Sequence, residues 1–192
     1  MPRTLAIAGG VAWIAGVPLS IVSIPAPSPM VSLSIGEILL VASVACLMIV
    51  GLAMARSVAW QVLRRTASLA LIVTAAAAIS VAAMYALVGD TVPLWGILDP
   101  DALVAPAWAG WVGTVTAVAI AAGRVSPPSA RWVVAVGAML QIVAWAWYAA
   151  QGGGVGDLVG FALPAGILIF GVGWMLIGAL TEDEARILAA PA

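Results

Sequence analysis

Residues 34–56 read SIGEILLVASVACLMIVGLAMAR, and this stretch decides the fold class. Its residues 35–55 hold one charged side chain, Glu37. As an α-helix they are long enough to cross the roughly 30 Å hydrocarbon core of a bilayer. Ser34 and Glu37 have the spacing of a capping box, which marks the start of a helix. We therefore expect a transmembrane helix over residues 35–55.

The rest of the chain has the same apolar character. Of its 192 residues, 65% are hydrophobic and 8% are charged, and the mean hydropathy is +1.20. A soluble domain is about half apolar and about a quarter charged. We therefore predict an all-α, polytopic integral membrane protein, a six-transmembrane-helix bundle that forms one membrane domain. Because six spans use most of the chain, we expect no folded domain outside the membrane. The predicted spans are residues 5–24, 35–55, 66–88, 107–122, 132–150 and 158–180.

Arginine positions predict the orientation. The chain has no lysine, and its basic residues are Arg3, Arg56, Arg64, Arg65, Arg124, Arg131 and Arg186. They lie at the N-terminus, in the even-numbered connections and at the C-terminus, whereas the odd-numbered connections carry aspartate and no arginine. Since basic residues stay on the cytoplasmic side, we expect both termini in the cytoplasm. Arginine without lysine, with abundant alanine, glycine and proline, favours a bacterial protein, and hence the cytoplasmic (inner) membrane.

The missing residue types exclude much chemistry. The chain has no histidine, lysine or asparagine, and Cys46 is its single cysteine. It therefore offers no imidazole for haem or a catalytic metal, no Schiff-base lysine and no serine–histidine pair. One cysteine cannot form an intrachain disulfide or a thiolate metal cage. We expect no enzyme, no cofactor, no metal site and, without a basic cluster, no nucleic-acid partner.

The fifth span carries the main candidate site. Gln141 lies about ten residues into it, and Gln141, Trp145 and Tyr148 are spaced i, i+4, i+7 on one helix face. An amide, an indole and a phenol on one face suit a pocket for a small molecule. The alternative is that Gln141 forms a hydrogen bond across the bundle and that the aromatic side chains reach the interface. Glu37 is the one intramembrane carboxylate, either a proton or cation site or part of the capping box, which we favour.

The tryptophans and small residues have simpler explanations. Of nine tryptophans, we expect an interfacial belt of Trp95, Trp108 and Trp111 at the outer boundary and of Trp60 and Trp132 at the inner one. Trp13 lies nearer mid-membrane. In the third connection, Asp99-Pro100-Asp101 predicts a short surface helix that ends before Pro106. The glycines of the sixth span let helices approach closely, within the chain or at a second subunit.

Two functions fit these observations. The first is a non-enzymatic accessory, assembly or scaffold component of a membrane complex, with another membrane subunit or a second copy of this chain as partner besides the lipid bilayer. The alternative is a small-molecule binding or transport protein with its site on the fifth span, for a small apolar, aromatic or cationic ligand. In size and span number the chain is similar to the substrate-capture subunits of energy-coupling-factor vitamin transporters, a similarity that no motif supports.

Overall fold

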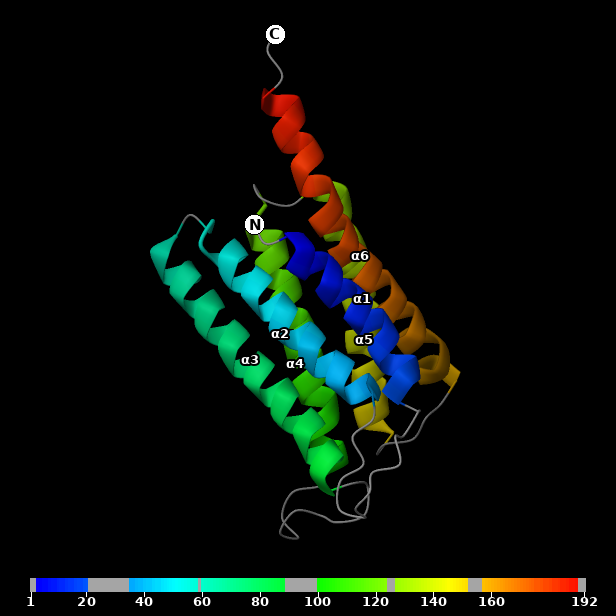
Figure 1. Cartoon of the computed structure of the whole chain (residues 1–192). Helices are drawn as coiled ribbons and strands as arrows, with labels where there is room; N and C mark the ends of the chain where they lie inside the picture. The colour runs from blue at the N-terminus through cyan, green and yellow to red at the C-terminus, as the bar shows by residue number, and fades with distance from the viewer. Residues whose placement is uncertain are drawn as a thin grey trace.

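The computed structural model describes residues 3–20, 35–58, 60–88, 100–123, 127–151 and 157–189, and within them the regular structure is entirely helical. Five helices, α2 to α6, contain a segment long and apolar enough to cross a membrane. In α1 the apolar segment, Arg3–Gly16, is shorter than these five. Residues 21–24 of the first predicted span lie outside the described residues. The helices of Figure 1 are α1 (Arg3–Ser20), α2 (Ile35–Ala55), α3 (Gln61–Val88), α4 (Pro100–Ala121), α5 (Pro128–Ala150) and α6 (Asp157–Ala189).

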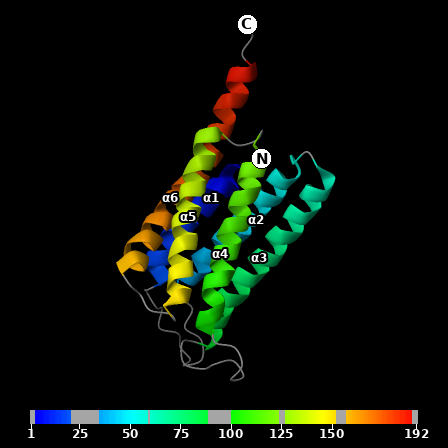
Figure 2. The same ribbon diagram turned by 180° about the vertical axis from the view of Figure 1, so that it is seen from behind.

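Five of the helices close into a ring. Helix α1 packs between α2 and α6, α2 packs against α4, α4 against α5, and α5 against α6. We call α1, α2, α4, α5 and α6 the five-helix ring. Helix α3 contacts α2 and α4 and lies on the outside of the bundle, as the two opposite views in Figures 1 and 2 show. The interior of the five-helix ring is therefore built without α3.

The bounds of four helices differ most from the sequence expectation. Helix α5 begins at Pro128, four residues before the predicted span, with a proline in its first turn. Helix α3 begins at Gln61, inside the loop predicted up to residue 65, because no helix-breaking residue follows Trp60. Helix α4 is continuous from Pro100, so the predicted separate surface helix before Pro106 is wrong. A proline removes one backbone hydrogen bond, and here the buried Ala105 beside it packs inside the bundle. Helix α6 continues past residue 180 to Ala189 and extends beyond the bundle (Figure 1).

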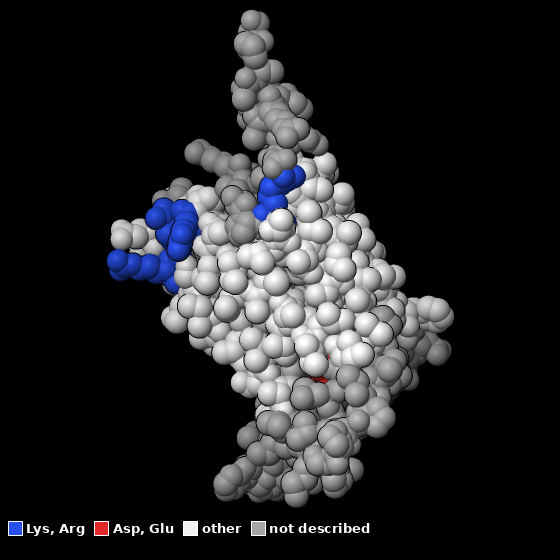
Figure 3. All heavy atoms as spheres, viewed as in Figure 1, with Lys and Arg blue, Asp and Glu red and all other residues white. Residues whose placement is uncertain are grey.

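Charge separates along the bundle axis. The start of α1, the turn between α2 and α3, and the end of α6 lie at one end of the bundle (Figure 1). Arg3, Arg56, Arg64 and Arg65 lie in or beside these segments, and Figure 3 shows blue arginine side chains gathered at this end. Glu37, in the first turn of α2, lies at the opposite end. These four arginine residues therefore lie at one end of the bundle, together with the start of α1 and the end of α6.

Glycines hold α1, α5 and α6 in close contact. A Cβ atom on Gly173 would lie 2.6 Å from Cγ2 of Val134, and one on Gly10 would lie 2.5 Å from the carbonyl oxygen of Gly171. A Cβ atom on Gly137 would collide with the backbone of Phe170. These distances are too short for any side chain, so the helix backbones touch directly. The sixth-span glycines thus serve packing within the chain.

Candidate ligand-binding cavity

A cavity of about 170 Å³ lies inside the five-helix ring. Every helix of the ring contributes at least one residue to its wall, and α3 contributes none. It lies nearer the Glu37 end than the arginine end, because its wall uses the early part of α2, α4 and α6 and the late part of α1. The lining residues are Trp13, Leu40, Trp108, Gln141, Trp145, Leu163 and Ile167.

Aromatic contacts hold Trp13 in the cavity wall. Its indole meets Trp108 edge-to-face, with ring centroids 5.6 Å apart and planes at 69°, and it meets Phe170 at 5.4 Å. Trp13 is 3% exposed, and its Nε1 has no hydrogen-bond partner among the described residues. Edge-to-face pairs of this kind favour one relative orientation. The wall is therefore shaped before any ligand arrives.

Gln141 is the polar residue of the wall. It is 1% exposed, and its Nε2 donates to the carbonyl oxygens of Gly137, at 3.3 Å, and Gly166, at 3.2 Å. The first acceptor is one turn earlier on α5, and the second is on α6. Neither glycine has a side chain to cover its carbonyl, which is why the amide can reach both. The structure confirms the expectation that Gln141 forms a hydrogen bond across the bundle, and it also places Gln141 at the cavity.

The structure brings two of the four candidate residues into the cavity wall. Gln141 and Trp145 line it together. Tyr148 does not belong to the lining set but packs edge-to-face on Trp145, with ring centroids 5.8 Å apart. Glu37 is half-buried and also outside the lining set, one helical turn before Leu40. Its capping partner Ser34 lies outside the described residues. The binding role of these residues stays a prediction.

The other lining residues come from helices that sequence reasoning did not connect with the fifth span. For Trp13, one sequence feature indicated an interior position, because we expected this residue nearer mid-membrane than the tryptophans of the belt. Trp111 is 0% exposed and Trp108 lines the cavity, so both side chains face the bundle interior, unlike the lipid-facing side chains of the expected belt. Because α4 begins at Pro100 instead of residue 107, both tryptophans lie about two turns further along their helix than expected. Trp95 lies outside the described residues.

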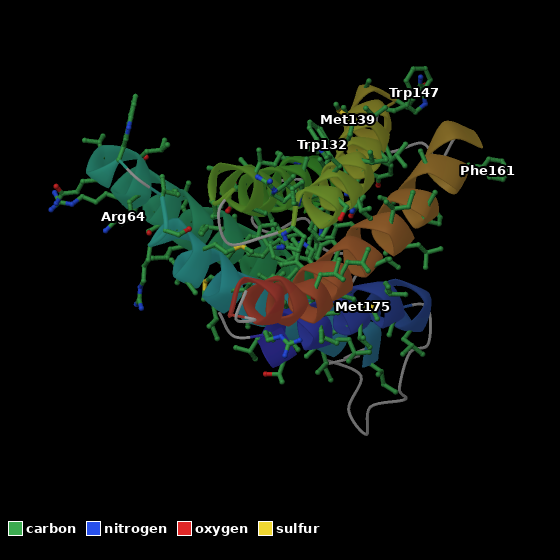
Figure 4. The ribbon with its side chains drawn as sticks, turned by 90° about the horizontal axis from the view of Figure 1, so that it is seen from above. Arg64, Trp132, Met139, Trp147, Phe161 and Met175 are labelled. Atoms are coloured by element: carbon green, nitrogen blue, oxygen red, sulfur yellow. The ribbon has the colours of Figure 1, made fainter. Side chains whose placement is uncertain are left out.

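Two tryptophans match the predicted belt. Trp60 is 77% exposed and Trp132 is 71% exposed, and both lie toward the arginine end of the bundle. Figure 4 shows Trp132, Met139 and Trp147 on the outer side of α5, and Trp147 and Phe161 project away from the bundle. Trp145 and Trp147 face different sides of α5, because Trp145 lines the cavity and Trp147 is exposed on the outer surface.

The cavity wall carries no ionisable side chain. Its seven residues are three indoles, three aliphatic side chains and one amide. Among the described residues, no three His, Cys, Asp or Glu side chains gather where they could hold a metal ion. The wall offers dispersion contact, aromatic edges and faces, indole N–H groups, and one amide carbonyl. Such a surface suits the reversible binding of a small, mainly apolar molecule.

Comparison of the chain with protein-family models, with curated proteins and with solved structures gave no significant match. The functional argument therefore rests on the geometry of the cavity.

Proposed function

We propose that this chain is a non-enzymatic membrane protein that binds, and as a transport component carries, a small molecule in the cavity of its five-helix ring. One observation carries this proposal: all five helices of the ring meet at one cavity of about 170 Å³ that contains the buried Gln141. A ligand that fills this cavity makes packing contacts with all five helices.

The proposal includes the placement of the chain in the membrane. Helix α1 packs between α2 and α6, so it lies at the same depth as these two apolar helices and forms the sixth span. The end that carries Arg3, Arg56, Arg64 and Arg65 faces the cytoplasm of a bacterium, because basic residues are retained on that side. Both chain ends then lie in the cytoplasm. The cavity lies in the outer half of the cytoplasmic membrane.

A second candidate function is an accessory, assembly or scaffold subunit of a membrane complex. The outer face of α5 favours it, since Trp132, Val136, Met139, Val143 and Trp147 are all exposed there. Lipid tails cover such a face as well as a protein partner does. The sixth-span glycines no longer support a subunit contact, because they pack against α1 and α5. The cavity therefore favours the binding function.

Mass spectrometry of the intact protein, extracted gently from its own membranes, tests the proposal. The expected result is a population heavier by the mass of one small molecule. The Trp145→Ala variant should lose this population, because Trp145 lines the cavity. The matched control Trp147→Ala, two residues along the same helix and facing outward, should keep it (Figure 4). A mass increase equal to a polypeptide, unchanged in both variants, would instead support the subunit function.

A further inference from the structure

The hydrogen bonds of Gln141 limit what the cavity can bind. A side-chain amide has two donor hydrogens on nitrogen and an acceptor oxygen. Gln141 donates both hydrogens within the protein, to the carbonyl oxygens of Gly137 and Gly166. The acceptor oxygen, Oε1, receives no hydrogen bond from any group in the described part of the chain. Gln141 therefore presents the cavity with an acceptor and no free donor.

The surroundings of this acceptor are mainly apolar. Gln141 is 1% exposed, and the residues around it in the cavity wall are indoles and aliphatic side chains. An acceptor without a donor is unfavourable in such surroundings. A ligand that carries an N–H or O–H group removes this cost, whereas a ligand with acceptors alone leaves it in place.

The size and the aromatic wall define the rest of the ligand. Three indoles, from Trp13, Trp108 and Trp145, enclose about 170 Å³. An engineered apolar cavity of about 150 Å³ binds benzene. The space therefore accepts a single aromatic ring with small substituents, or two fused rings. Aromatic side chains contact such a ring through faces and edges.

Charge is the remaining property. An aromatic wall can also bind a cation. In this cavity, however, a cation would have no counter-ion among the lining residues, and the burial of an unpaired charge is strongly unfavourable. Glu37 lies one turn nearer the start of α2 than Leu40 and outside the wall. The cavity composition therefore favours a neutral ligand.

We propose that the ligand is a neutral, flat molecule of one or two fused aromatic rings, with an N–H or O–H donor that bonds to Oε1 of Gln141. This inference rests on the proposed binding function and names its substrate class.

Indole and indene test the donor requirement. They have nearly the same shape, and indole alone has an N–H group. Calorimetric titration of the full-length protein in lipid nanodiscs, with empty nanodiscs subtracted, gives both affinities. Wild-type protein should prefer indole by about tenfold, the effect of one buried hydrogen bond. Gln141→Leu and Gln141→Met should lose this preference while they still bind indene. Partition into lipid is identical for each protein, so it cancels when the preferences are compared.

The outcomes separate the two proposals. Equal binding of indole and indene by wild-type protein, with both lost in Trp145→Ala, would overturn the donor requirement and leave the binding function standing. Tighter binding of tetramethylammonium than of indole would overturn the neutral class. No binding of any of the three probes, together with no bound molecule on the extracted protein, would overturn the binding function and this inference with it. The wild-type comparison stands even where a Gln141 variant fails to fold.

Discussion

The side-chain amide of Gln141 on α5 donates to the backbone carbonyl oxygen of Gly166 on α6 at 3.2 Å. The two helices come close enough for this bond because Gly137 and Gly166 face each other across the contact. A Cβ atom on Gly166 would lie 2.8 Å from Cγ of Gln141 and 3.0 Å from the carbonyl oxygen of Gly137. The residue that supplies the polar atom of the cavity thus also joins two walls of that cavity.

Gln141→Leu should lower the free energy of unfolding by about 0.6 to 2 kcal/mol, the range for a hydrogen bond between membrane helices. Unfolding in mixed detergent micelles, followed by circular dichroism, measures it. Gln151→Leu is the control, because Gln151 is exposed at the end of α5. Equal stability of Gln141→Leu and wild-type protein would show that the bond to Gly166 contributes nothing.

Gly137→Ala should prevent close packing of α5 and α6, since the added methyl group would collide with the backbone of Phe170. We expect a loss of at least about 2 kcal/mol or failure to fold, as for overpacked cores. Gly160→Ala on α6 is the control, because no atom lies within 4 Å of the added group. That variant should be as stable as wild-type protein or slightly more stable, because alanine favours helix over glycine. The thermal midpoints of the two variants decide the matter, and similar losses would contradict the packing described above.

Ser43→Ala should weaken the contact between α1 and α2. The buried Ser43 hydroxyl donates to the carbonyl oxygen of Gly9 at 2.7 Å. We expect a loss of about 0.6 to 2 kcal/mol in the unfolding experiment. Ser68→Ala removes a hydroxyl that donates within its own exposed helix turn, to Arg64 at 2.9 Å, and should cost less. A larger loss for Ser68→Ala would disagree with this arrangement.

Labelling of single cysteines tests the orientation. In a Cys46→Ala background, Ser57→Cys lies at the arginine end and Ile35→Cys at the Glu37 end, and both positions are exposed. A membrane-impermeant maleimide added to intact cells should label Ile35→Cys, and it should label Ser57→Cys only after permeabilisation. The reverse pattern would invert the proposed orientation.

Ligand binding should not depend on pH between about 5.5 and 8.5. None of the seven lining residues titrates in this range, and Glu37 lies outside the wall. Titrations of wild-type protein and of Glu37→Gln should therefore give the same dissociation constant across the range. A pH-dependent affinity that disappears in Glu37→Gln would instead assign Glu37 a role in binding.

Local sequence patterns predicted which segments are helical better than they predicted the first and last residues of each helix. The bounds of α2 match the predicted residues 35–55, because the capping-box pair Ser34 and Glu37 marks the start of its apolar run and Arg56 ends that run. A helix start at Pro100 was predicted, but its continuation through Pro106 into α4 was missed because Pro106 suggests a break. Arg64 and Arg65 suggested a loop at the membrane surface, but arginine is a good helix former and α3 continues through both.

The sequence predicted part of the cavity wall, namely the two residues that α5 contributes. The spacing of Gln141 and Trp145 placed both on one helix face, and both line the cavity. Which helices meet that face depends on contacts between distant parts of the chain, such as that of Trp13 with Trp108. No single-helix pattern carries this information. The choice of Gly166 as acceptor for Gln141 likewise depends on how closely α5 approaches α6.

The five-helix ring is closed by its first and last members, α1 and α6, which pack side by side. Translation produces α1 first and α6 last, so α1 exists long before this neighbour. Until α6 is present, Trp13 lacks Phe170, and Gln141 lacks Gly166. The cavity is therefore completed last during biosynthesis, and a nascent chain that stops before α6 leaves one N–H of Gln141 without its acceptor.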